Sequence, residues 1–131
     1  MKKSILLFGA ILMLGVILTG FSQGHKPQDS SNEEIQNGIK EVIAKTKELK
    51  DLAEKQANNS DEINQLGKEI EESWDKIEKK VEKAYPQDYQ YIEESLYPLI
   101  TVAKQKKLNK TKIRTLSMET LDKLEQFNQK L

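Results

Sequence analysis

Apolar side chains recur every three or four residues through most of this chain, and that period limits the fold more than any other feature. The most regular run lies between the polar stretch 58–61 and Pro86. Its apolar members fall within about 80° of one another on a helical wheel. They are Ile63, Leu66, Ile70, Trp74, Ile77, Val81 and Ala84. This stripe predicts one amphipathic helix that ends before Pro86, because proline lacks the amide hydrogen that a helix needs.

Three further stripes of the same period predict three more helices. The first of them ends near residue 57, before the polar stretch that favours a turn. The next predicted helix begins after Pro86, and Pro98, which lies inside this helix, is expected to produce a kink. The last begins at Asn109 or Thr111, either of which suits an N-cap. Four helices with short connections predict an all-α, up-down antiparallel bundle over residues 33–131.

The residues before the bundle are typical of an export segment. Lys2 and Lys3 precede an uncharged, largely apolar run that continues to residue 23. Such a run is either a cleaved signal peptide or a retained anchor, since its length is close to the ~20 residues of a membrane helix. In both cases we expect the bundle to be extracytoplasmic, secreted or anchored at the cell surface. Residues 24–32 are polar and predict a flexible spacer.

Composition argues against several classes of function. Basic and acidic residues balance at 21 each, so no basic excess indicates a nucleic-acid partner. There is no Cys, and the only histidine, His25, lies in the predicted spacer. The sequence also lacks a glycine-rich phosphate loop. We therefore expect no enzymatic activity and no cofactor.

The aromatic residues are gathered in one stretch, because the only Trp and all four Tyr lie between residues 74 and 97. Trp74, Tyr89 and Tyr85 fall along apolar stripes and are expected to pack in the core. A second apolar face of the third predicted helix carries Tyr91, Pro98 and Val102, with Tyr97 at its edge. Two explanations are open. Either this helix is central and contacts two neighbours, or these four residues form an interaction surface for a partner.

A row of carboxylates lies next to the apolar stripe of the second predicted helix, the one that ends before Pro86. Glu71, Asp75, Glu78 and Glu82 project on one side of it. Oxygen ligands of this kind can hold a hard cation, and Glu93 of the next helix is a candidate facing ligand. The alternative is a solvated face whose charge neighbouring lysines neutralise.

The same region resembles a helical extracytoplasmic module of bacterial proteins. The matching positions are Gly67, Trp74, Ile77, Val81, Tyr85-Pro86, Tyr89, Ile92-Glu93, Leu96 and Pro98-Leu99. Similar segments occur in small secreted proteins and lipoproteins, and they precede the membrane domain of Ftr1-type iron permeases. The resemblance covers residues 63–131 and implies a role at the cell surface near metal uptake. The Arg-Glu-x-x-Glu iron motif of the permeases does not occur in this chain, so we expect that it is not the transporter itself.

Two hypotheses of function follow. The first is a non-enzymatic, extracytoplasmic helical bundle that acts as a protein-interaction or envelope-associated module. Its partner would be an envelope protein or a second copy of the chain, with membrane contact only through an uncleaved N-terminal segment. The second is an accessory protein of iron uptake that binds a cation through the helix carboxylates.

Overall fold

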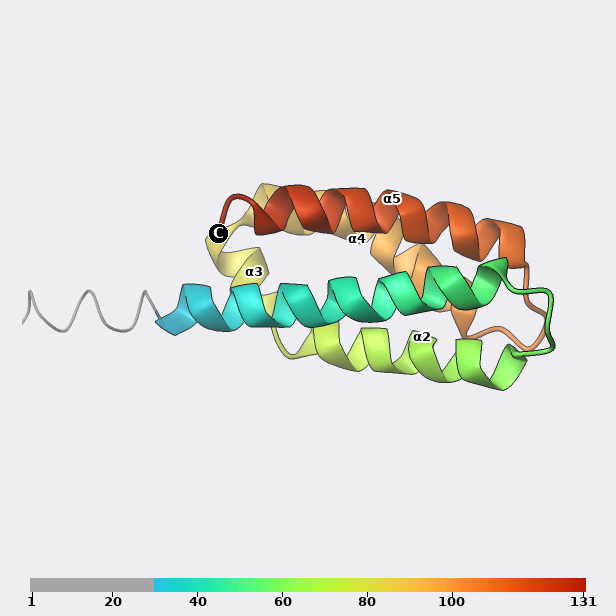
Figure 1. The fold of residues 1–131 in the computed structure, drawn as a ribbon. Coiled ribbons are helices and arrows are strands. Elements are labelled where there is room, and N and C mark those ends of the chain that lie inside the picture. Colours follow the sequence, from blue (N-terminus) through green and yellow to red (C-terminus); the bar gives the residue numbers. More distant parts are fainter. Residues whose placement is uncertain (1–29) are drawn as a thin grey trace, which may run out of the picture. The chain divides into compact units, whose positions relative to one another are not determined.

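Five helices make up residues 30–131, the part of the chain that the computed structural model describes (Figure 1). The first helix covers residues 30–54. It is followed by α2 (Ser60–Asp75), α3 (Glu78–Ala84), α4 (Pro86–Ala103) and α5 (Lys110–Asn128). The described residues contain no strand, which confirms the all-α prediction. The predicted export segment and most of the predicted spacer lie outside the described residues, whereas residues 30–32 already belong to the first helix.

The predicted second helix is divided into α2 and α3, so the expected count of four helices is not reproduced. The helix is interrupted at Lys76 and Ile77, where the Ile77 amide donates to the Trp74 carbonyl oxygen at 2.9 Å, three residues back instead of four. Ile77 has φ −117° and ψ −16°. Its side chain lies against Gly38 of the first helix, which has no Cβ to obstruct it. The helix therefore breaks where an isoleucine packs against the neighbouring backbone.

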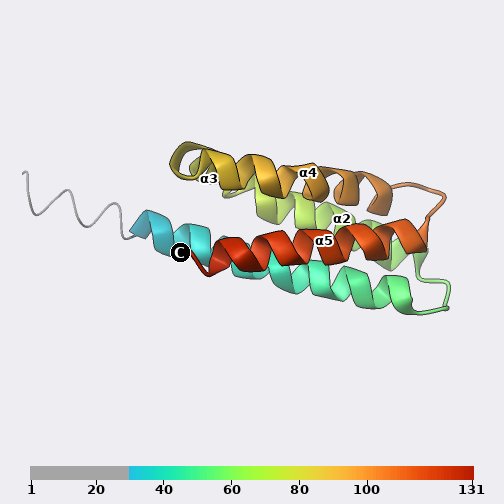
Figure 2. The same ribbon diagram turned by 90° about the horizontal axis from the view of Figure 1, so that it is seen from above.

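The helices pack side by side as an antiparallel bundle (Figures 1 and 2). Helix α4 contacts α2, α3 and α5. The first helix is joined to α5 by an ion pair between Lys47 and Glu125 at 2.9 Å. None of the described helices has the length and hydropathy needed to cross a membrane.

The core is built from the predicted apolar stripes. Its largest fully buried side chains are Trp74, Phe127, Ile35, Ile39, Leu49, Ile63, Ile70, Ile92, Leu96, Leu99, Ile113 and Leu124. Ala84 is exposed, because it lies in the last turn of α3, beyond the packed part of the stripe. Burial of this many large apolar side chains is the main favourable contribution to the stability of the bundle.

Polar side chains close the two long connections at one end of the bundle. The Lys110 ammonium donates to the carbonyl oxygens of Lys55 and Ala57, at 2.9 and 2.8 Å, just after the C-terminus of the first helix. Asn109 accepts a hydrogen bond from the Lys112 amide at 3.0 Å and is therefore the N-cap of α5. The connections 55–59 and 104–109 consequently lie next to each other.

Gly38→Ala tests the close approach of the first helix to Ile77. A Cβ at residue 38 would lie 2.5 Å from the Ile77 Cγ2 atom, so either the Ile77 side chain or the backbone of one of the two segments must shift. In an exposed helix Ala is more favourable than Gly by about 1 kcal/mol. For Gly38→Ala we expect the opposite effect, a decrease of about 1 to 3 kcal/mol in the free energy of unfolding, as for other overpacked cores.

The measurement is chemical denaturation followed by circular dichroism. Ala44→Gly, an exposed position in the same helix, is the matched control and should cost about 1 kcal/mol through helix propensity alone. Stabilisation by Gly38→Ala would contradict the packing described for Ile77.

Candidate functional site

The aromatic stretch contributes Trp74 to the core, with Tyr85 and Tyr89 partly buried against it, whereas Tyr91 and Tyr97 are exposed. Trp74 is fully buried, and its ring stacks on that of Tyr89 with 6.2 Å between centroids and 10° between planes. The indole Nε1 donates to Glu93 Oε1 at 3.4 Å. Trp74 thus packs α2 against α4 and has a partner for its only polar atom, as buried tryptophans usually do.

Two tyrosines of α4 surround the same carboxylate. A hydrogen bond to Glu93, together with burial, raises the pKa of Tyr89 to about 12. Burial and hydrogen bonds to Glu93 and Glu78 raise the pKa of Tyr97 as well, and its hydroxyl donates to Glu78 Oε2 at 3.0 Å. Both phenols therefore stay protonated and act as hydrogen-bond donors, Tyr89 within α4 and Tyr97 from α4 to Glu78 of α3.

Tyr91 belongs to a different contact, between α4 and α5. The Lys123 ammonium lies 4.5 Å from the centroid of the Tyr91 ring, a cation–π distance. Lys123 is only 5% exposed and also pairs with Glu119 at 3.3 Å and Glu94 at 3.5 Å. Tyr91 is 44% exposed, yet one face of its ring covers this buried lysine.

The predicted interaction surface is consequently divided. Val102 is only 5% exposed, which agrees with the explanation that this helix contacts more than one neighbour. Pro98 is exposed, whereas Tyr91 contacts α5 and Tyr97 bonds to α3. The physical reason is that α4 packs against three other elements, so a residue opposite the first apolar stripe still meets a neighbour.

The predicted carboxylate row does not converge on a common point. Glu71 pairs with Lys104, Glu78 accepts from Tyr97, and Glu93 accepts from Trp74. Asp75 and Glu82 are exposed. Within residues 30–131 no group of three or more acidic, His or Cys side chains is placed to hold a metal ion. The positions of these five carboxylates do not support the cation-site prediction.

A groove that the sequence did not predict lies between the first helix and α2. Its volume is about 500 Å³. We call it the acidic groove; it is lined by Glu48, Leu52, Asp61, Glu62, Gln65, Leu66 and Glu69. The two leucines are more than nine-tenths buried and the acidic side chains surround them. No lysine or arginine lines the groove.

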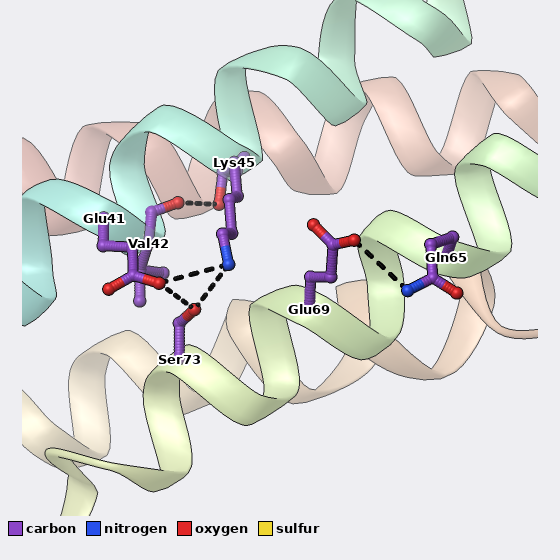
Figure 3. Close-up of polar contacts among 7 residues, drawn as sticks. Glu41, Val42, Lys45, Gln65, Glu69 and Ser73 are labelled. Atoms are coloured by element: carbon purple, nitrogen blue, oxygen red, sulfur yellow. Dashed lines mark hydrogen bonds and ion pairs between the residues drawn. The ribbon is translucent and has the colours of Figure 1, made fainter.

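The carboxylates of the acidic groove lack basic partners. Among the described residues, Glu48, Asp61 and Glu62 form no ion pair, and Glu69 accepts only the Gln65 amide at 3.2 Å (Figure 3). Asp61 and Glu62 lie in the first turn of α2, where negative charge stabilises a helix. That explanation does not extend to Glu48 and Glu69, in the middle of their helices.

Next to the groove, a polar triad bridges the two helices (Figure 3). The Lys45 ammonium donates to Ser73 Oγ at 3.0 Å, and the Ser73 hydroxyl donates to Glu41 Oε1 at 2.9 Å. Lys45 and Glu41 also form an ion pair at 3.1 Å. The hydrogen bond from Ser73, followed by that from Lys45, lowers the pKa of Glu41. Lys45 is therefore already engaged and does not neutralise the acidic groove.

No family model, curated protein or solved structure that was compared matches this chain. The arrangement of its own residues is thus the basis for assigning a function.

The Glu41 triad predicts a pH-dependent contribution to stability. A lowered pKa in the folded state means that the contribution is present above the usual carboxyl pKa of 4.5 and is lost as pH falls through the lower, folded value. Because the Glu41 side chain is 44% exposed, Glu41→Gln should cost no more than about 1 kcal/mol at pH 7. The cost should vanish in acid.

Urea unfolding at pH 7 and at about pH 3 measures this difference. Glu72→Gln is the control, an exposed residue of α2 that forms no ion pair among the described residues. An equal cost for Glu41→Gln at both pH values would contradict the assigned role of the charge.

Proposed function

We propose that this chain is a non-enzymatic, extracytoplasmic helical bundle that binds a protein partner through the acidic groove. The observation that supports this most strongly is the composition of the groove: a floor of two leucines, Leu52 and Leu66, under four carboxylates. Protein interfaces commonly combine an apolar centre with a polar rim. The partner surface would carry lysine or arginine next to an apolar side chain.

The chemistry of the remaining surface favours binding over catalysis. The described residues contain neither His nor Cys, and the phenols of Tyr89 and Tyr97 are held as neutral hydrogen-bond donors. The carboxylates of the acidic groove lie on an open seam, where water competes for every charge. The Ser73 hydroxyl does contact a carboxylate, that of Glu41, but Ser73 is buried between two helices, where a substrate would not reach it.

The extracytoplasmic location rests on the sequence of residues 1–23. Two lysines followed by an uncharged apolar run favour export of everything that follows. A neutral overall charge and a packed core suit a small module that works without disulfides.

Site-specific photo-crosslinking in cells tests the proposal. A photoreactive amino acid replaces Gln65 in the acidic groove of the full-length chain, and Gln90 on α4 in a control chain. We expect a discrete crosslinked protein in the envelope fraction from position 65 alone. Glu62→Lys in the same chain should remove that product, because it reverses one charge of the groove.

Two results would count against a docking role for the groove. One is the absence of any product from position 65, and the other is an identical set of products from positions 65 and 90. Circular dichroism of each variant establishes that the bundle is intact, since Gln65, Glu62 and Gln90 are all exposed.

A further inference from the structure

The end of the bundle that carries the connection between α4 and α5 is strongly basic. Residues 104–114, which we call the basic loop, contain five lysines and one arginine and no acidic residue. Two of these are engaged, because Lys104 pairs with Glu71 and Lys110 bonds to backbone carbonyls. The other four form no ion pair among the described residues and are exposed: Lys106, Lys107, Lys112 and Arg114.

Two lysines of the basic loop interact unfavourably with the N-terminus of α5 in the same molecule. Lys110 and Lys112 lie in the first turn of α5, and this turn contains no acidic residue. A helix N-terminus carries partial positive charge, so lysines there repel it and carboxylates would stabilise it. The basic loop is thus a surface to which carboxylates would bind favourably.

The acidic groove and the basic loop lie at the same end of the bundle but on different sides of α2. Asn64 Nδ2 donates to the carbonyl oxygens of Ala103 and Gln105, at 2.6 and 3.1 Å, and holds the basic loop on one side. Glu71 lies about two helical turns after Asn64 on the same side of α2, and it pairs with Lys104. The groove residues of α2 occupy other positions of the helical wheel and face the first helix.

We infer that the acidic groove takes the basic loop of a second copy of this chain. The charges are complementary, since the groove carries four carboxylates and no basic residue, whereas the loop carries four exposed cations and no acidic residue. Because both surfaces lie at one end of the bundle, a two-fold axis at that end forms the same contact twice. The inference rests on the proposed function, as it supplies the occupant of the groove.

Such a dimer would be weak and salt-sensitive. Exposed ion pairs contribute little individually and are screened as ionic strength rises. The two leucines of the groove floor add some apolar contact, but they are already mostly buried. Association should therefore depend mainly on the charges.

Cysteine crosslinking of the full-length chain tests the inference, because the chain has no Cys of its own. Three exposed glutamines form a matched set: Gln65→Cys in the groove, Gln105→Cys in the basic loop and Gln90→Cys elsewhere on α4. Differently tagged chains are mixed in mild detergent and treated with a short bis-maleimide. We expect the 65–105 product at a yield at least about fivefold above the 65–90 product, and a loss of that excess at about 0.5 M NaCl.

Charge reversal provides the second measurement. Glu62→Lys in the Gln65→Cys chain should lower the yield with Gln105→Cys, and so should Lys106→Glu in the other chain. Combining the two reversals should restore it, since opposite charges again face each other. Thermal melts of the variants show whether each bundle is still folded.

Equal yields of the 65–105 and 65–90 products, or reversals without effect, would overturn the inference. If position 65 still photo-crosslinks to a different envelope protein in that case, the proposed function stands and only the second copy is excluded. If position 65 gives neither product, both the proposed function and this inference fail.

Discussion

The rest of the bundle depends on the burial of one indole ring. Trp74 lies between α2 and α4, stacks on Tyr89 and donates to Glu93. Tyr97, on the same helix as Glu93, donates its hydroxyl hydrogen to Glu78 on α3. These contacts fix α4 against two neighbouring elements. The concentration of aromatic side chains near this ring is thereby explained by packing and hydrogen bonding.

A second consequence of close packing is the surface between the first helix and α2. Gly38 lets Ile77 approach the first helix, and the helical structure is interrupted at Ile77, between α2 and α3. Beyond it, the triad of Glu41, Lys45 and Ser73 bridges the two helices. Further along the same seam the side chains are acidic and no lysine reaches them, which leaves the acidic groove as the surface that packing does not explain.

The period of apolar residues was sufficient to predict an all-α fold and most of the core, because each stripe marks the buried side of a helix. The break at Lys76 and Ile77 was not predictable, since Ile77 fits the 3.6-residue period and its contact with Gly38 joins two residues that are 39 positions apart in the sequence. The burial of Val102 did not follow from the main stripe alone. Its position on the wheel is opposite that stripe, and α4 packs against three elements, which agrees with the explanation that this helix contacts more than one neighbour.

The acidic groove could not be predicted from the order of residues. Glu48 and Leu52 meet Glu62 and Leu66 only because the first helix and α2 pair in antiparallel register. The sequence signal that does exist is the contrast between this acidic seam and the basic loop at 104–114, which carries no acidic residue. This contrast in charge indicates a binding surface only when the fold shows which of these residues lie next to one another.

The most direct test of the account is the stability of Trp74→Ala, measured by urea unfolding with circular dichroism. If the aromatic stretch is the packing centre of the bundle, the substitution should lower the free energy of unfolding by about 3 to 5 kcal/mol, as for other buried large aromatics. A loss below about 1 kcal/mol would contradict it. The indole would then be a surface group available to a ligand, and the functional site would have to be sought around Trp74 instead of in the acidic groove.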